Sequence, residues 1–220
     1  MKLIIVESPN KRATISKLLN GYSKEKEYMV AASVGHIADI AITGKYGLGV
    51  DIDSGNFEVT YDVLDRKKGT VAGLKKLVQQ ADEVYLATDP DREGEAIAWH
   101  LAKVLDLDID KTKRLYFHEI TKRGINDAFL NVSNIDMKMV RSQEARRVLD
   151  RIVGFRLSWL VQTKIQSQSA GRVQSAVLKL ICDREKEITS FNKEEYYNLF
   201  ITVKNDDNQY TLKLIDEDIK

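Results

Sequence analysis

The sequence has a single cysteine, no apolar run long enough to cross a membrane and no signal-peptide pattern at its start. One cysteine, Cys182, excludes an internal disulfide and any zinc site built from several cysteines within these 220 residues. Because no window reaches about 18 consecutive apolar residues, no transmembrane helix is expected. The missing signal peptide makes a cytoplasmic location the default expectation. What remains is ordinary globular composition, with 43% hydrophobic residues.

The chain as a whole has no large excess of positive or negative charge, but one segment is strongly basic. The chain carries 34 basic and 33 acidic side chains, so its formal net charge is only +1. Between residues 137 and 182, however, there are nine basic side chains and only two acidic ones. This basic block is where a polyanion is expected to bind.

Residues 1–134 alternate between short apolar runs and helical patterns, which predicts an α/β layer with a mostly parallel sheet. The predicted strands cover residues 3–6, 28–34, 57–63, 84–88 and 115–117, and the predicted helices cover 12–19, 70–80, 93–105 and 122–130. Residues 35–56 hold five of the twelve glycines and predict a long loop. We expect a first domain over residues 1–134.

The pattern changes after residue 134. Two helices are predicted, over residues 138–166 and 173–188, and they define a second domain at 135–190. A buried stripe is expected on the first of them, formed by Val140, Val148, Ile152, Phe155 and Trp159. Residues 197–202 and 209–215 then alternate with a period of two around a polar turn, which predicts one β-hairpin in a third segment, 191–220.

The most informative stretch runs from Tyr85 to Glu95, where a strand-like run delivers Asp89, Asp91 and Glu93 into a loop before a helix. Spacing by two places side chains on one side of an extended backbone. Three carboxylates gathered there repel one another unless a cation lies between them, and Mg²⁺ prefers such oxygen ligands. The alternative interpretation is an acidic helix start, with Asp89 as the N-cap.

A second acid arrives in the same way. The run at residues 3–6 is apolar throughout, as expected of a strand buried on both faces, and it ends at Glu7. Pro9 cannot extend a central strand, so the chain turns there into a helix that carries Lys11. Ligands bind beyond the carboxyl ends of strands in open α/β sheets. Glu7 is therefore expected beside the Asp89 loop, and Lys11 is a candidate phosphate contact.

The basic block contains a helix face suited to phosphate recognition. Arginine recognises phosphate through two parallel hydrogen bonds, and we expect Asp150 to orient the guanidinium of Arg147 or Arg151. We expect this face to lie opposite the buried stripe, and a solvated face with mixed ion pairs is the alternative. The face consists of Gln143, Arg147, Asp150, Arg151 and Gly154. Further along, a turn of small residues leads into the helix bearing Arg172 and Gln174.

Together these stretches resemble the bacterial-type DNA topoisomerase I family, the type IA topoisomerases, rather than topoisomerase III or reverse gyrase. Any one of the matching motifs is weak evidence, but six in the right order are highly specific. They are IVESPNK at 5–11, SVGHI at 33–37, ATDPDREGEAIAWHL at 87–101, HEIT at 118–121, QEARRVLDR at 143–151 and SAGRVQS at 169–175.

The resemblance implies a Toprim domain, then a helical domain that grips single-stranded DNA, and then the start of a β-rich arch domain. It implies that Mg²⁺ is held by Glu7, Asp89, Asp91 and Glu93, and that Lys11 and Arg92 touch the scissile region. The DNA contacts that it implies are His36, Gln143, Arg146, Arg147, Asp150, Arg151, Arg172 and Gln174. A monomer without membrane contact is expected.

In this family a tyrosine attacks one DNA strand and keeps the 5′ phosphate, so the break can be resealed without ATP. None of the nine tyrosines of this sequence lies in the family's nucleophile motif. We therefore expect the 220-residue chain alone not to relax supercoiled DNA. The alternatives are a Toprim nuclease or primase, which would leave free hydroxyl ends, and a DNA-binding piece without catalysis.

Overall fold

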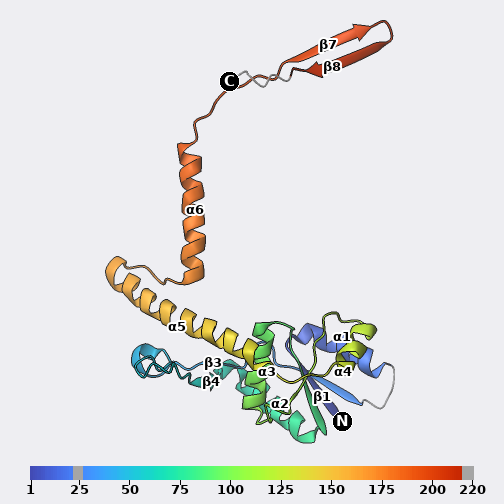
Figure 1. Cartoon of the computed structure of the whole chain (residues 1–220), viewed down its shortest axis with the longest axis vertical. Helices are drawn as coiled ribbons and strands as arrows, with labels where there is room; N and C mark the ends of the chain where they lie inside the picture. Colours follow the sequence, from blue (N-terminus) through green and yellow to red (C-terminus); the bar gives the residue numbers. More distant parts are fainter. Residues whose placement is uncertain (22–26, 215–220) are drawn as a thin grey trace. The chain divides into compact units, whose positions relative to one another are not determined.

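The computed structural model describes residues 1–21 and 27–214, which form two compact units, Met1–Arg172 and Val173–Lys220. No helix in the described ranges is long and apolar enough to cross a bilayer. The first unit, whose α-helices are labelled in Figure 1, contains β1 (Lys2–Val6), α1 (Pro9–Asn20), β2 (Tyr28–Ala32), β3 (Ala38–Ile40), η1 (Lys45–Gly47), β4 (Tyr61–Val63), η2 (Asp65–Lys67), α2 (Lys68–Gln80), β5 (Glu83–Ala87), α3 (Arg92–Val104), β6 (Lys113–Arg114), α4 (Lys122–Leu130) and α5 (Met137–Ile165).

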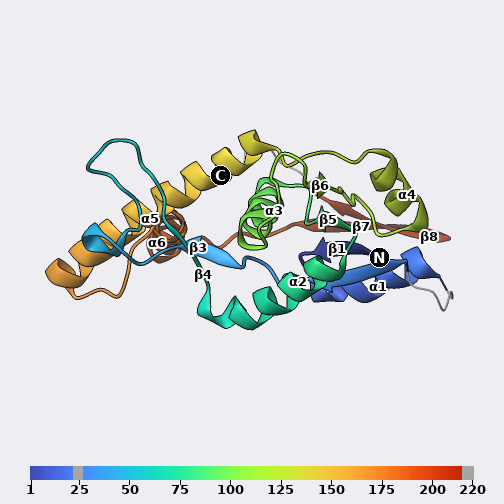
Figure 2. The ribbon, with the colours of Figure 1, turned by 90° about the horizontal axis from the view of Figure 1, so that it is seen from below.

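The centre of the first unit is a parallel sheet in the order β2-β1-β5-β6. Side chains along β1 alternate between its two faces, so Leu3 and Ile5 pack with α2 and α3, whereas Ile4 and Val6 pack with α1 and α4. Figure 2 shows these helices around the strands of the sheet. Both faces are thus covered, which explains why the run is apolar throughout. The predicted α/β class, with a mostly parallel sheet flanked by helices, is confirmed.

The glycine-rich segment differs from the prediction. Residues 35–56 are not a single loop, because β3 lies within them and pairs antiparallel with β4 in a separate two-stranded sheet. The predicted strand 57–63 therefore shrinks to β4 and does not join the main sheet. Likewise, the strand predicted at 115–117 is found earlier in the chain, as β6. Leu115, the residue after β6, still donates its amide to the Leu86 carbonyl on β5 at 2.9 Å.

The buried stripe predicted on α5 is only half correct. Val140 and Val148 are buried, but Phe155 and Trp159 are 37% and 66% exposed. Only the first half of the helix packs on the sheet unit, where Val140 joins the core beneath α3. The expectation that the arginine face lies opposite this stripe is wrong, since Gln143 and Arg151 are buried as well. At 100° per residue the two sets are neighbours on the helix.

The second unit contains α6 (Arg172–Ser190), except for its first residue, which belongs to the first unit. It also contains the hairpin of β7 (Phe200–Asn205) and β8 (Asn208–Lys213). The predicted helix and hairpin are thus both present. The hairpin begins later than expected, and the last residue predicted for its second strand, Ile215, lies outside the described residues. Cys182 is exposed on α6.

One glycine is required where β5 passes into α3. The Gly94 amide donates to the Asp91 carboxylate at 2.7 Å, and the Thr88 hydroxyl donates to the Gly94 carbonyl at 2.5 Å. A Cβ atom on Gly94 would lie 2.1 Å from the Asp89 carbonyl oxygen, so even a methyl group would push the loop off the helix.

We predict that Gly94→Ala lowers the free energy of unfolding by about 1–3 kcal/mol, the usual cost of overpacking. Gly73→Ala is the matched control, because a Cβ atom there meets nothing within 4 Å on α2. That change should stabilise the protein by about 0.5–1 kcal/mol through helix propensity. Urea unfolding followed by circular dichroism measures both, and an unchanged midpoint for Gly94→Ala would contradict the close approach.

Candidate active site

The two predicted acidic loops lie side by side. β1 and β5 are neighbouring parallel strands in which Val6 is in register with Ala87, so Glu7 and Asp89 leave the same edge of the sheet. Burial, and then the nearby Asp89 carboxylate, raise the pKa of Glu7, while Lys11 partly offsets them. The structure therefore brings Glu7, Asp89 and Lys11 together, and the ammonium of Lys11 lies 2.5 Å from the Asp89 carboxylate.

The three acids of the β5–α3 loop do not share one side of an extended backbone. Asp91 is the helix N-cap, a role that we had assigned to Asp89 in the alternative interpretation. Arg92 then starts the helix, so Glu93 leaves the extended segment and lies in the first helical turn. The i, i+2 spacing rule applies only as far as Asp91, and Arg92 is exposed beside it.

Glu93 connects three separate segments. Its carboxylate accepts a hydrogen bond from the Gln143 side chain on α5 at 3.0 Å and lies 3.6 Å from the His36 imidazole. Here the predicted catalytic acid meets two of the predicted DNA contacts. These groups line a cavity of about 360 Å³, together with Ala38, Asp39, Tyr61, Leu64, Arg66, His100, Arg146, Arg147 and Asp150.

An acid that sequence analysis missed organises the basic helix. Asp39 on β3 accepts two hydrogen bonds from Arg147, at 3.0 and 2.5 Å, and lies 3.7 Å from Arg151. Burial would raise the pKa of Asp39, but the hydrogen bonds from Arg147 and the Ile40 amide, together with the charges of Arg147 and Arg151, outweigh it and hold the pKa below the usual range. The side chain of Arg151 also donates to the Ile40 carbonyl at 2.8 Å.

The expected role of Asp150 is therefore wrong. Instead of orienting Arg147 or Arg151, Asp150 accepts from Arg172 at 2.7 Å and has Arg146 at 3.9 Å. Arg172 thereby joins the set of residues gathered on α5, since it belongs to the same compact unit. Gln174 belongs to the second unit, where it lies on α6. Outside the helix backbone next to it, no atom of the described residues would lie within 4 Å of a Cβ atom placed on Gly154.

A second cavity, of about 650 Å³, continues along α5 past Arg147 and Arg151. Tyr46 and Trp159, both largely exposed, lie on its wall. Arg156 lies over the Tyr46 ring at 4.9 Å, and Arg151 lies over the Phe155 ring at 4.8 Å. Exposed rings beside guanidinium groups are suited to unpaired nucleobases and their phosphates.

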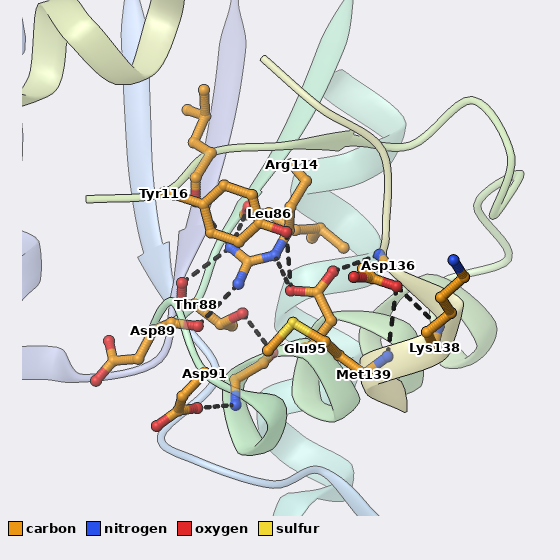
Figure 3. Close-up of polar contacts among 12 residues, drawn as sticks. Leu86, Thr88, Asp89, Asp91, Glu95, Arg114, Tyr116, Asp136, Lys138 and Met139 are labelled. Atoms are coloured by element: carbon orange, nitrogen blue, oxygen red, sulfur yellow. Dashed lines mark hydrogen bonds and ion pairs between the residues drawn. The ribbon is translucent and has the colours of Figure 1, made fainter. Parts of the chain in front are cut away.

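A fully buried ion pair holds the acidic loop from behind (Figure 3). Arg114 and Glu95 are both 0% exposed, and their side chains meet at 3.0 Å. Arg114 also donates to backbone carbonyls along the end of β5 and the loop, those of Leu86, Thr88 and Asp89, at 2.9–3.1 Å. The Glu95 carboxylate accepts further hydrogen bonds from Tyr116 and from the Asp136 amide at the start of α5.

His100 lies buried under the first cavity. It is 5% exposed, and among the described residues neither ring nitrogen has a hydrogen-bond partner. Its ring packs against Tyr61, Trp99 and His36, at centroid distances of 4.8, 5.0 and 6.2 Å. Burial, aided by charge on His36 and Lys103, lowers the pKa of His100 to about 4.

The carboxylates fit a hard divalent cation in their chemistry but not as a preformed cage. All four predicted ligands are oxygen donors, and the Asp89 and Asp91 carboxylates add to burial in raising the pKa of Glu7. Across residues 1–21 and 27–214, however, no three acidic, histidine or cysteine side chains converge closely enough to hold an ion. Asp89 contacts Lys11, Asp91 caps α3, and Glu93 contacts His36 and Gln143.

Comparison with known proteins shows which families the chain is similar to. A Toprim domain family matches residues 2–120, and a DNA topoisomerase family matches residues 134–219. The structure of full-length topoisomerase I from Thermotoga maritima is similar over 99% of this chain, with 45% sequence identity and a TM-score of 0.78. The chain spans 35% of the length of that protein.

Glu95→Gln leaves a buried guanidinium without its counter-charge, and we predict that it lowers the free energy of unfolding by about 3–5 kcal/mol. Glu58→Gln is the matched control, because Glu58 is exposed and a surface change of this kind costs less than about 0.5 kcal/mol. Urea unfolding measures both. Equal stability of the two variants would show that the buried ion pair does not hold the loop.

The buried His100 predicts a loss of stability in acid. Between pH 6.5 and 4 the unfolded chain binds a proton at this histidine and the folded chain does not. The free energy of unfolding therefore decreases as the pH is lowered through that window. The loss reaches about 3 kcal/mol at pH 4. His100→Gln should remove this part of the pH dependence, whereas His118→Gln, a change at an exposed histidine, should retain it. Parallel profiles of His100→Gln and the unchanged protein would refute the prediction.

Proposed function

We propose a function for this chain from one premise: it belongs to the bacterial type IA DNA topoisomerase family. We infer that it supplies the acidic half of the active site and a single-stranded DNA groove of an enzyme that relaxes negatively supercoiled DNA. In this reaction one strand is cut through a 5′-phosphotyrosine, the other passes through, and the break is resealed without ATP.

The contact between Glu93 and Gln143 carries this proposal. It joins the acidic edge of the sheet to the arginine face of α5 around one cavity. A strand that lies along α5 with its phosphates toward Arg146 and Arg172 would bring its backbone to the acids. An acidic site for proton transfer and a cationic surface for the substrate are what cleavage of a phosphodiester requires.

The acids and their neighbours take separate roles in the proposal. Glu7, whose pKa is raised, retains a proton closer to neutral pH than an ordinary carboxyl, which suits a general acid at the leaving 3′ oxygen. Lys11 and Arg92 lie at the same edge, where each can reach a phosphate oxygen. His36 and Gln143 orient Glu93 through the contacts described above.

We further propose that Mg²⁺ binds at this edge through Asp89 and Asp91, with Glu93 as a further candidate, and through Glu7 once Glu7 has given its proton to the leaving oxygen. When bound, it supplies positive charge that positions phosphate oxygens for resealing. Release of Asp89 from Lys11 would accompany such binding and would free the lysine for a phosphate. The reaction also needs a tyrosine nucleophile, and we expect that this chain alone does not relax DNA.

Single-stranded DNA binding tests the proposal. We predict that a fluorescent oligonucleotide binds the 220-residue chain with an affinity that falls steeply as salt rises, since phosphate contacts release counterions. Arg146→Ala should weaken binding and flatten the slope of log affinity against log salt by about 0.7, the value for one lost phosphate contact on a single strand. Fluorescence anisotropy between 50 and 200 mM salt, about the range in which such effects are resolved, measures this.

Arg123→Ala is the matched control, because this exposed arginine lies on α4, among residues outside both cavities. Equal losses for the two variants would mean that charge alone, rather than α5, binds DNA.

Magnesium binding is tested separately. Isothermal titration should detect Mg²⁺ binding that Asp89→Asn with Asp91→Asn weakens, and an unchanged affinity would exclude the proposed ligands.

A further inference from the structure

The turn before His36 has a strained backbone. Val34 has a φ of 61°, in the left-handed region, and is the residue just after buried Ser33. Left-handed geometry is unusual and unfavourable for a β-branched residue. Because the Val34 side chain is 49% exposed, burial of its own side chain offsets little of that cost. The surrounding contacts must therefore hold the turn.

Hydrogen bonds tie both flanks of this turn to the end of β1. The Ser33 amide donates to the Val6 carbonyl at 2.9 Å, and the Gly35 amide donates to the Glu7 carbonyl at 3.2 Å. Further on, the Leu64 amide donates to the Ile37 carbonyl at 3.0 Å. The Gly35 amide belongs to the same peptide group as the Val34 carbonyl, so these contacts hold the N–H side of that group and leave its carbonyl to another donor.

The remaining contact comes from a buried lysine. Lys67, at the end of η2, is 9% exposed, and its ammonium donates a hydrogen bond to the Val34 carbonyl. The Lys67 amide donates in turn to the Leu64 carbonyl at 2.7 Å, so the start of the side chain is fixed as well. A buried ammonium is costly unless it is hydrogen-bonded. The hydrogen bond to the Val34 carbonyl therefore offsets part of the cost of burying this cation.

We propose that Lys67 is a positioning residue for the active site. By holding the Val34 carbonyl in the left-handed turn, Lys67 directs the imidazole of His36 toward Glu93. Lys67 itself is not among the residues that line the cavity, so it acts through His36 and not by contact with DNA. This inference rests on the proposed function, in which His36 and Glu93 belong to one DNA-cleaving site.

The test combines DNA binding with a direct readout of His36. We expect Lys67→Met to weaken the affinity for a single-stranded oligonucleotide about fivefold, the effect of one lost hydrogen bond. It should also shift the His36 imidazole signals in a ¹H–¹⁵N NMR spectrum of the free protein. Lys68→Met, a change at the exposed neighbour that pairs with Asp65, should do neither.

A double-variant cycle separates positioning from simple stabilisation. In a His36→Ala background, Lys67→Met should have no further effect on DNA affinity although it still lowers thermal stability. Lys67→Arg, which keeps a donor and folds even if the methionine variant does not, should retain the His36 signals and most of the affinity. Unshifted His36 signals in Lys67→Met, or a full fivefold loss that persists without His36, would overturn the inference.

Failure of the proposed function gives a different result. If the unchanged chain does not bind single-stranded DNA at all, the binding arm is lost and the function proposed for the site is wrong. The NMR arm then still decides whether Lys67 holds His36, since it needs no DNA. Shifted His36 signals in Lys67→Met but not in Lys68→Met would support the positioning role in that case too.

Discussion

The buried ion pair of Arg114 and Glu95 is the interaction on which the candidate site depends. One guanidinium satisfies the carbonyls at the end of β5 and in the acidic loop, and the carboxylate that neutralises it also accepts from the Asp136 amide at the N-cap of α5 and from Tyr116. Removing two charges from water is costly, and only this many hydrogen bonds make it tolerable. The pair fixes where the acidic loop ends and where the arginine helix begins.

Sequence patterns predicted the elements that depend on neighbours in the chain. Apolar runs located β1 and β5, and the acids that follow them lie together because parallel strands end at one edge. Helical periodicity located α5 but not its buried face, because the arginine side is covered by β3, which lies far away in the sequence. Short strands such as β3 and β6 carry too few residues for a period to be read.

The partners of the site residues were the least predictable part. Asp39 and Arg147 are separated by 108 residues, and nothing in the local sequence of either identifies the other. The choice of Asp150 as the partner followed from helical spacing, which favours contacts within one helix. The same reasoning missed Glu95, whose position near a helix start is typical of a surface acid. His100 gave no signal, since its role depends on burial alone.

The contact between Asp39 and Arg147 has a consequence for how tightly a strand can be held. Asp39 occupies the Nε and Nη2 side of the Arg147 guanidinium, so in the proposed complex a DNA phosphate gains this pair of donors only by displacing Asp39. Such an exchange returns little net free energy and leaves the strand easier to release. In the proposed function, a strand that binds in competition with Asp39 is released more readily after each cycle, which favours turnover over retention.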